Sequence, residues 1–316
     1  MASFDSVNYA IRPNKAVERK LVFSALRKLA SFLDISEYRY IGFGSLWFVD
    51  FTMAHRLLGI SSMVSIEQNE IGFRRGEYNR PLSCIKMIHG ESSLVIPDLA
   101  LEEKPAIVWF DYDSSIGGPA LDDIQSIVAR CAANSIMLVT LSAKMDDLPD
   151  QDENGGGIDL ETSLRKICGD LVPTPLPPKS LHRKNFPRLI SEIVSNQFLT
   201  AAVESGRAEK FIKLFDIIYT DGTPMVTFGG IMATVADAER ISETVKSSQW
   251  EGIVAGLINI PPLTIREKAA LDQVMPSAVA LTPADIDKMG FPLKGEQIAS
   301  YQKHYIHYPM LGEVQF

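Results

Sequence analysis

Two glycines separated by one residue follow a short apolar run near the start of the chain. The stretch YIGFGS places Gly42, Phe43, Gly44 and Ser45 directly after residues that are typical of a buried strand. Because glycine has no Cβ, a backbone of this composition can approach a ligand very closely. The same spacing suits a tight turn that packs a helix against a strand. The glycine pair therefore has two interpretations, a cofactor loop and a structural turn.

Four acidic residues stand where later apolar runs end. Glu67 ends SMVSIE, Glu91 follows in IHGES, and Asp111 and Asp113 end PAIVWFDYD. Ligands of open α/β sheets bind outside the carboxyl ends of the strands, so these positions are candidates for a site. Each also has a structural alternative: Glu67 and Glu91 could be solvated acids, and one aspartate could cap the next helix.

Strand-like and helix-like segments alternate through the first half of the chain. We predict strands at 38–44, 62–67, 84–90, 105–113 and 135–143, and helices at 15–34, 46–59, 120–134 and 185–206, with 69–80 a helix or an irregular connection. This alternation indicates βαβ units and a parallel sheet covered on both faces. Within 213–232 two apolar runs flank Asp221-Gly222, which is typical of an antiparallel hairpin. The predicted fold class is a doubly wound, Rossmann-like α/β sheet, mainly parallel with a terminal antiparallel hairpin.

The glycine spacing favours one class of cofactor over another. Dinucleotide-binding loops carry a third glycine three residues after the second, and that position holds the bulky Trp47. S-adenosylmethionine has no phosphate; it needs a close backbone approach and an acid that accepts from its ribose hydroxyls. We predict that Gly42, Phe43, Gly44 and Ser45 contact this cofactor and that Glu67 binds the ribose.

The ordered set of motifs resembles the class I S-adenosylmethionine-dependent methyltransferases, and in particular bacterial O-methyltransferase-like proteins. The matching pieces are YIGFGS, VSIE, HGES, IVWFDYD and DIIYTDGTPMVTFGG, within 38–232. The resemblance implies that Glu91 meets the adenine amine and that Asp111 lies beside the methyl donor. Asp113 then orients the substrate or acts as a general base. The competing hypothesis is a non-catalytic, methyltransferase-like scaffold subunit of a multi-protein bacterial system.

The N-terminal segment NYAIRPNKAVERK is basic in an otherwise acidic protein. Tyr9, Arg12 and Lys15 are candidates for binding the acceptor substrate, because an aromatic ring with nearby cations suits a phosphate-bearing molecule or a nucleic-acid end. The alternative is a charged helix face, including Arg19, that stays solvated.

Composition limits the remaining classes. The 316 residues are 46% hydrophobic with a formal net charge of −8, which disfavours bulk electrostatic wrapping of nucleic acid. Cys84, Cys131 and Cys168 are scattered, and neither they nor the histidines have metal-ligand spacing, so we predict no metal site and a cytoplasmic protein with reduced thiols. No run approaches the ~18 apolar residues that span a bilayer, so we predict no membrane association.

We divide the chain into three parts. Residues 1–37 form a basic segment and a helix, and 38–233 form the Rossmann-like domain with an exposed, mobile acidic insertion at 144–163. Residues 234–316 form a small helical appendage, which could dock a protein partner or a second copy of the chain.

Overall fold

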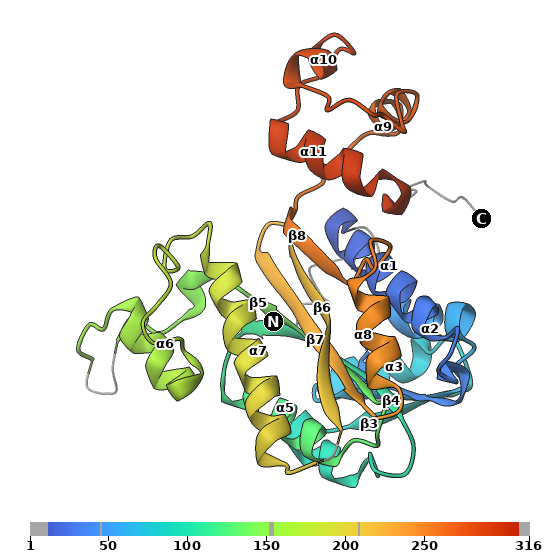
Figure 1. The fold of residues 1–316 in the computed structure, drawn as a ribbon, viewed down its shortest axis with the longest axis vertical. Coiled ribbons are helices and arrows are strands. Elements are labelled where there is room, and N and C mark those ends of the chain that lie inside the picture. The colour runs from blue at the N-terminus through green and yellow to red at the C-terminus, as the bar shows by residue number, and fades with distance from the viewer. Residues whose placement is uncertain (1–11, 45, 152–154, 208, 310–316) are drawn as a thin grey trace.

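A single eight-stranded sheet organises the molecule (Figure 1). The computed structural model describes residues 12–44, 46–151, 155–207 and 209–309. The strand order across the sheet is β3-β2-β1-β4-β5-β7-β6-β8. The strands are β1 (Arg39–Phe43), β2 (Ser62–Glu67), β3 (Ile85–His89), β4 (Ala106–Ser115), β5 (Ile136–Ser142), β6 (Lys210–Thr220), β7 (Pro224–Ala233) and β8 (Ile253–Ile258).

Strand direction follows the predicted fold class. β1 to β5 are parallel, and β7 is antiparallel to both of its neighbours, β5 and β6. The turn of the β6–β7 hairpin therefore lies at the carboxyl edge of the parallel strands. A mainly parallel sheet with a terminal antiparallel hairpin is confirmed.

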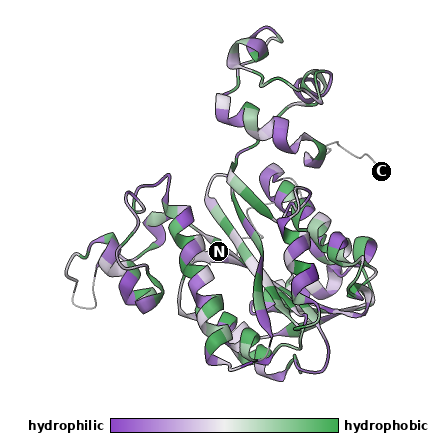
Figure 2. Cartoon of the chain, viewed as in Figure 1, coloured by the Kyte–Doolittle hydropathy of each residue, from purple (hydrophilic) through white to green (hydrophobic). Residues whose placement is uncertain are grey.

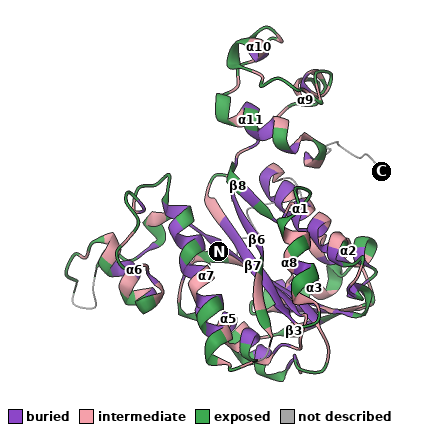
Figure 3. Cartoon of the chain, in the orientation of Figure 1, coloured by how far each residue is buried: buried purple, intermediate pink, exposed green. Residues whose placement is uncertain are grey.

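Helices cover both faces, and each face has its own hydrophobic core. One core packs α1 (Pro13–Leu29), α2 (Val49–Leu58), α3 (Glu70–Asn79) and α8 (Ala238–Lys246); the other packs α4 (Ser92–Val95), α5 (Gly118–Arg130), α6 (Leu160–Cys168) and α7 (Phe186–Glu204). The central strands are predominantly hydrophobic (Figure 2) and buried (Figure 3). In β4 every residue from Ala106 to Phe110 is buried, as expected for a strand covered on both faces.

Two predicted boundaries need correction. The segment expected to be a helical appendage from residue 234 supplies β8, which pairs in parallel with β6, so the sheet continues past that boundary. Its helices α9 (Ile265–Asp272), α10 (Pro283–Asp287) and α11 (Gly295–His304) follow the strand and lie beyond the end of the sheet in Figure 1. The insertion predicted to lack regular structure contains the start of α6, because the Asp159 side chain caps the Thr162 amide and Leu164 is buried.

Short 3₁₀ turns complete the described chain. They are η3 (Ile35–Glu37), η4 (Ile96–Asp98), η5 (Met145–Asp147), η6 (Gly169–Leu171) and η7 (Tyr305–His307). After η7, the Tyr308 hydroxyl donates to the Pro261 carbonyl at 3.3 Å, and the Tyr308 carbonyl accepts from the Lys20 ammonium of α1 at 3.4 Å. The end of the described chain is thus held against α1.

Candidate active site

The first turn of α1 is fixed at the carboxyl edge of the sheet. The Asp221 carboxylate, in the β6–β7 turn, accepts from the backbone amides of Asn14 at 3.2 Å and Lys15 at 2.9 Å. The Asn14 side chain also bonds both backbone polar groups of Ile260. These contacts satisfy amide groups that a helix start otherwise leaves unpaired, and they anchor α1 beside the end of β4.

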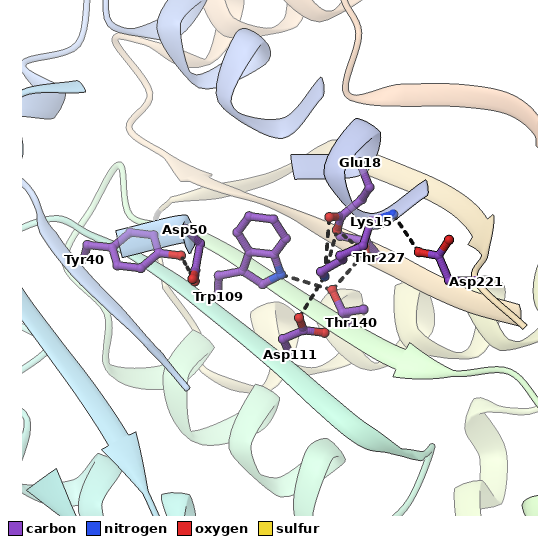
Figure 4. A network of polar contacts seen from close by, with 9 residues as sticks. All are labelled: Lys15, Glu18, Tyr40, Asp50, Trp109, Asp111, Thr140, Asp221 and Thr227. Carbon is purple, nitrogen blue, oxygen red and sulfur yellow. Dashed lines mark hydrogen bonds and ion pairs between the residues drawn. The ribbon is translucent and has the colours of Figure 1, made fainter. Parts of the chain in front are cut away.

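Lys15 lies under this anchored turn, buried at 2% exposure. Its ammonium is 2.8 Å from the Asp111 carboxylate of β4 and 3.4 Å from Glu18 on the same helix (Figure 4). The ammonium also lies over the rings of Trp109 at 5.0 Å and Tyr219 at 5.5 Å, within the range of cation–π attraction. Two carboxylates and two aromatic rings therefore compensate the buried charge of Lys15 in one polar centre.

Glu18 connects this centre to the middle of the sheet. The Thr227 hydroxyl donates to Glu18 Oε1 at 2.6 Å, Thr227 and Thr140 share a hydrogen bond of 2.8 Å, and the Trp109 indole donates to Thr140 at 3.0 Å. Glu18 Oε2 has no hydrogen-bond partner among the described residues. Burial raises the pKa of Glu18, and the nearby Lys15 charge opposes that rise. Figure 4 shows the continuous network from β7 to Asp111.

A second polar pair lies on the same face of the sheet. The buried Tyr40 hydroxyl of β1 donates to the Asp50 carboxylate of α2 at 2.7 Å. Burial raises the pKa of Asp50, while the Arg19 charge opposes the rise. Arg19 is buried at 5% exposure, so α1 brings two buried cations, Lys15 and Arg19, to this face.

Close packing requires the glycine inside β1, Gly42, and the glycine directly after it, Gly44. A Cβ on Gly42 would lie 2.9 Å from the Trp109 carbonyl oxygen, and a Cβ on Gly44 would lie 2.1 Å from the Ser65 hydroxyl oxygen. Neither of these described glycines has a left-handed φ. Phe43 stacks on Phe110 with ring centroids 4.4 Å apart, so its side chain packs into the core that also contains α5. Close packing therefore explains both glycine positions without a ligand.

Acidic side chains surround the edge next to this loop. Glu67 is half-buried at the end of β2 and accepts from the Asn69 amide at 2.7 Å. Burial raises the pKa of Glu67, and the negative charge of Asp113 adds to that rise. Asp111 forms an ion pair with Lys15, and the pairing of β4 with β5 shifts register between Asp111 and Ser115. Glu91 is exposed at the start of α4.

The structure redistributes the predicted site residues. Glu67 lies on β2, Asp111 and Asp113 lie on β4, and Gly42 and Phe43 lie on β1 between these strands, with Gly44 directly after β1. Ser45 and Tyr9 lie outside the described residues. Arg12 directly precedes α1. Lys15 and Arg19 are buried, so the alternative of a solvated helix face is wrong for both.

Sequence reasoning missed Glu18, Thr140, Thr227 and Asp221. Glu18 had a signal, since it stands three residues after Lys15 and thus on the same side of a helix. The two threonines had none, because their role depends on strands β5 and β7 being neighbours.

The acidic side chains at this edge fit S-adenosylmethionine. Glu67, Asp111 and Asp113 are carboxylates that can accept from hydroxyl groups and attract positive charge, which suits a ribose and a sulfonium. They would repel a pyrophosphate. Glu67 would hold the ribose end, and Asp111 would face the sulfonium.

Two further observations concern metal binding and membrane insertion. Among the residues that the structure describes, no three His, Cys, Asp or Glu side chains are grouped so that they could hold a metal ion. None of the described helices is both long and apolar enough to cross a membrane.

The sheet order and the late hairpin together define a doubly wound, Rossmann-like α/β fold. A model of the family described as putative O-methyltransferase matches residues 7–316, and the chain belongs to this family. The resemblance to class I S-adenosylmethionine-dependent methyltransferases is thereby confirmed. No curated protein matches the chain.

Solved structures with related folds are remote in sequence. Trm1 from Pyrococcus horikoshii, in complex with S-adenosyl-L-methionine, is 12% identical over 72% of this chain and 57% of its own, with a TM-score of 0.45. The chain thus spans little more than half the length of that protein. An S-adenosylmethionine-dependent methyltransferase from Mesorhizobium loti is 13% identical over 66% of this chain and 97% of its own, with a TM-score of 0.39. A putative S-adenosylmethionine-dependent methyltransferase from Listeria monocytogenes is 8% identical over 67% and 99%, with a TM-score of 0.38.

Proposed function

We propose that the protein transfers a methyl group from S-adenosylmethionine to an oxygen atom of an acceptor, at the carboxyl edge formed by β1, β2 and β4. The observation that carries this proposal is that Glu67 ends β2 and that Asp111 and Asp113 lie in the carboxyl-terminal half of β4, the two strands on either side of β1. Oxygen is the acceptor atom that the family description names. When bound, the cofactor supplies a methyl group whose bond to sulfur breaks as a bond to the acceptor oxygen forms, leaving a neutral thioether and releasing the acceptor proton.

The residues of this chain have distinct roles in the proposal. Glu67 would accept from the ribose hydroxyls, and the backbone of Gly42 to Gly44 would contact the amino-acid end of the cofactor. Asp111 would lie beside the sulfonium, and Asp113, which is exposed, would orient the acceptor hydroxyl and take its proton. Positioning of the two reactants supplies most of the rate, as expected for an in-line displacement.

The ion pairs of Lys15, a cation of the N-terminal segment, favour one class of acceptor over another. Lys15 is committed to Asp111 and Glu18, so it is not a free phosphate-binding group on the surface. We therefore favour an acceptor recognised through a hydroxyl at Asp113 over one that is recognised through phosphate at Lys15.

Calorimetry with S-adenosylmethionine tests the cofactor site. We expect about micromolar binding to the wild type, loss of at least about tenfold in affinity for Glu67→Ala, and no change for Glu37→Ala, an exposed glutamate before β1. Unchanged affinity in Glu67→Ala would refute the assigned ribose contact. Folded wild-type protein that binds no cofactor would refute the proposed function.

A further inference from the structure

Methyl transfer from a sulfonium destroys a positive charge, so the charge around the sulfur affects the reaction. A lone carboxylate beside the sulfonium would stabilise the cation before the reaction more than in the transition state, where the charge is already fading. Such a site would bind the donor tightly, bind the neutral product weakly, and oppose transfer. The charge balance next to Asp111 is therefore a functional property.

Lys15 provides that balance in this structure. Its ammonium lies 2.8 Å from Asp111, and only 3% of the Lys15 side chain is exposed, against 31% for Asp111. The cation is held there by Glu18, by the rings of Trp109 and Tyr219, and by the anchored start of α1. The exposed part of Asp111 at the proposed cofactor site thus belongs to an ion pair with Lys15 and is not an isolated negative charge.

We propose that Lys15 is the charge-balancing residue of the methyl-transfer site, cancelling the Asp111 carboxylate and so setting how strongly the site prefers the cationic methyl donor over its neutral product. This inference rests on the proposed function, because it needs the sulfonium to lie at Asp111. It concerns the relative affinity for S-adenosylmethionine and S-adenosylhomocysteine, which differ by the one positive charge on sulfur.

The test uses a background in which the buried charges can be removed safely. Removing Lys15 alone would leave two carboxylates without their cation, a change that strongly destabilises proteins. Glu18→Gln keeps an oxygen that accepts from Thr227 and removes one of those carboxylates. The full-length Glu18→Gln protein is therefore compared with variants that add Lys15→Met, Asp111→Asn or both.

Calorimetry with each of the two ligands gives the ratio of their affinities. We expect Lys15→Met to raise the preference for S-adenosylmethionine by about three- to tenfold, and Asp111→Asn to lower it by a similar factor. The combined variant should return to the ratio of the Glu18→Gln protein. Lys213→Met is the matched control, since it removes an ammonium paired with Asp216 elsewhere on the sheet and should leave the ratio unchanged.

The outcomes separate this inference from the proposed function. If Lys15 had a purely structural role, Lys15→Met would weaken the binding of both ligands by the same factor. An unchanged ratio of the two affinities in the Lys15→Met variant would therefore overturn the charge-balancing role. A ratio that shifts in the opposite direction would overturn it as well. If the folded wild type bound neither ligand, the proposed function itself would fail.

Discussion

Replacing Gly44 by alanine separates the two explanations of the glycine pair. The added methyl carbon would lie 2.1 Å from the Ser65 hydroxyl oxygen, 3.2 Å from the Phe48 ring and 3.3 Å from the Ser65 Cβ. The first contact is impossible without movement, and the other two are merely tight. Because the Gly44 backbone has no left-handed φ, alanine carries no conformational penalty there, and the cost comes from packing.

The magnitude follows from this geometry. Overpacking a closely packed site by one methyl group costs about 1–3 kcal/mol, so we expect Gly44→Ala to lower the free energy of unfolding by that amount. The Ser65 hydroxyl is buried and has no hydrogen-bond partner among the described residues, so Ser65→Ala removes the clashing atom without breaking a described bond. In the Ser65→Ala background the cost of Gly44→Ala should fall below about 1 kcal/mol.

Urea unfolding of the four proteins measures this double-mutant cycle, and cofactor calorimetry on the same proteins assigns the loop. A Gly44→Ala cost that is the same with and without the Ser65 hydroxyl would refute the packing argument. If stability recovers in the double variant but binding of S-adenosylmethionine does not, the loop contacts the cofactor directly. Recovery of both would leave Gly44 with a packing role alone.

Three further predictions concern the residues around this edge. Asp221→Ala should lower the free energy of unfolding by about 1–3 kcal/mol in urea, because α1 loses the cap on its first amides; a change below about 0.5 kcal/mol would contradict the anchoring role. The folded-state pKa of Glu18 is raised from its ordinary value of 4.5, so the folded protein binds an extra proton above that pH. The contribution of the Glu18 carboxyl to the free energy of unfolding is thus present below pH 4.5 and is lost as the pH rises through the folded-state pKa. Unfolding curves measured from acid pH upward should show no such loss in Glu18→Gln. Parallel pH profiles of the wild type and Glu18→Gln would refute this prediction. Glu91→Ala, at an exposed position, should leave the free energy of unfolding within about 0.5 kcal/mol of the wild type and weaken cofactor binding less than Glu67→Ala; a larger loss than at Glu67 would reverse the assigned roles.

The sequence predicted the fold because its signals are local. The runs that became β1 to β5 are dense in apolar residues, and the Asp221-Gly222 turn marks the hairpin without reference to the rest of the chain. β8 escaped prediction because its six residues include exposed positions and a glycine, and it becomes a strand by pairing with β6.

The candidate site was predictable in position and less so in electrostatics. The carboxyl ends of β2 and β4 follow from strand order alone, so Glu67 and Asp111 could be chosen from sequence. The burial of Lys15 could not, because it depends on Asp221 and Ile260 fixing the helix start from more than 200 residues away along the chain. A basic segment with the pattern of an exposed helix face thus supplies a buried counter-charge.

The position of S-adenosylhomocysteine in a crystal structure of its complex with this protein is the most direct test of the proposed cofactor site. We expect ribose hydroxyls within hydrogen-bonding distance of Glu67 and a sulfur atom facing the Asp111–Lys15 pair. A nucleoside bound elsewhere, for example in the depression at the opposite edge that Arg39, Ser62 and Lys86 line, would contradict the proposed site.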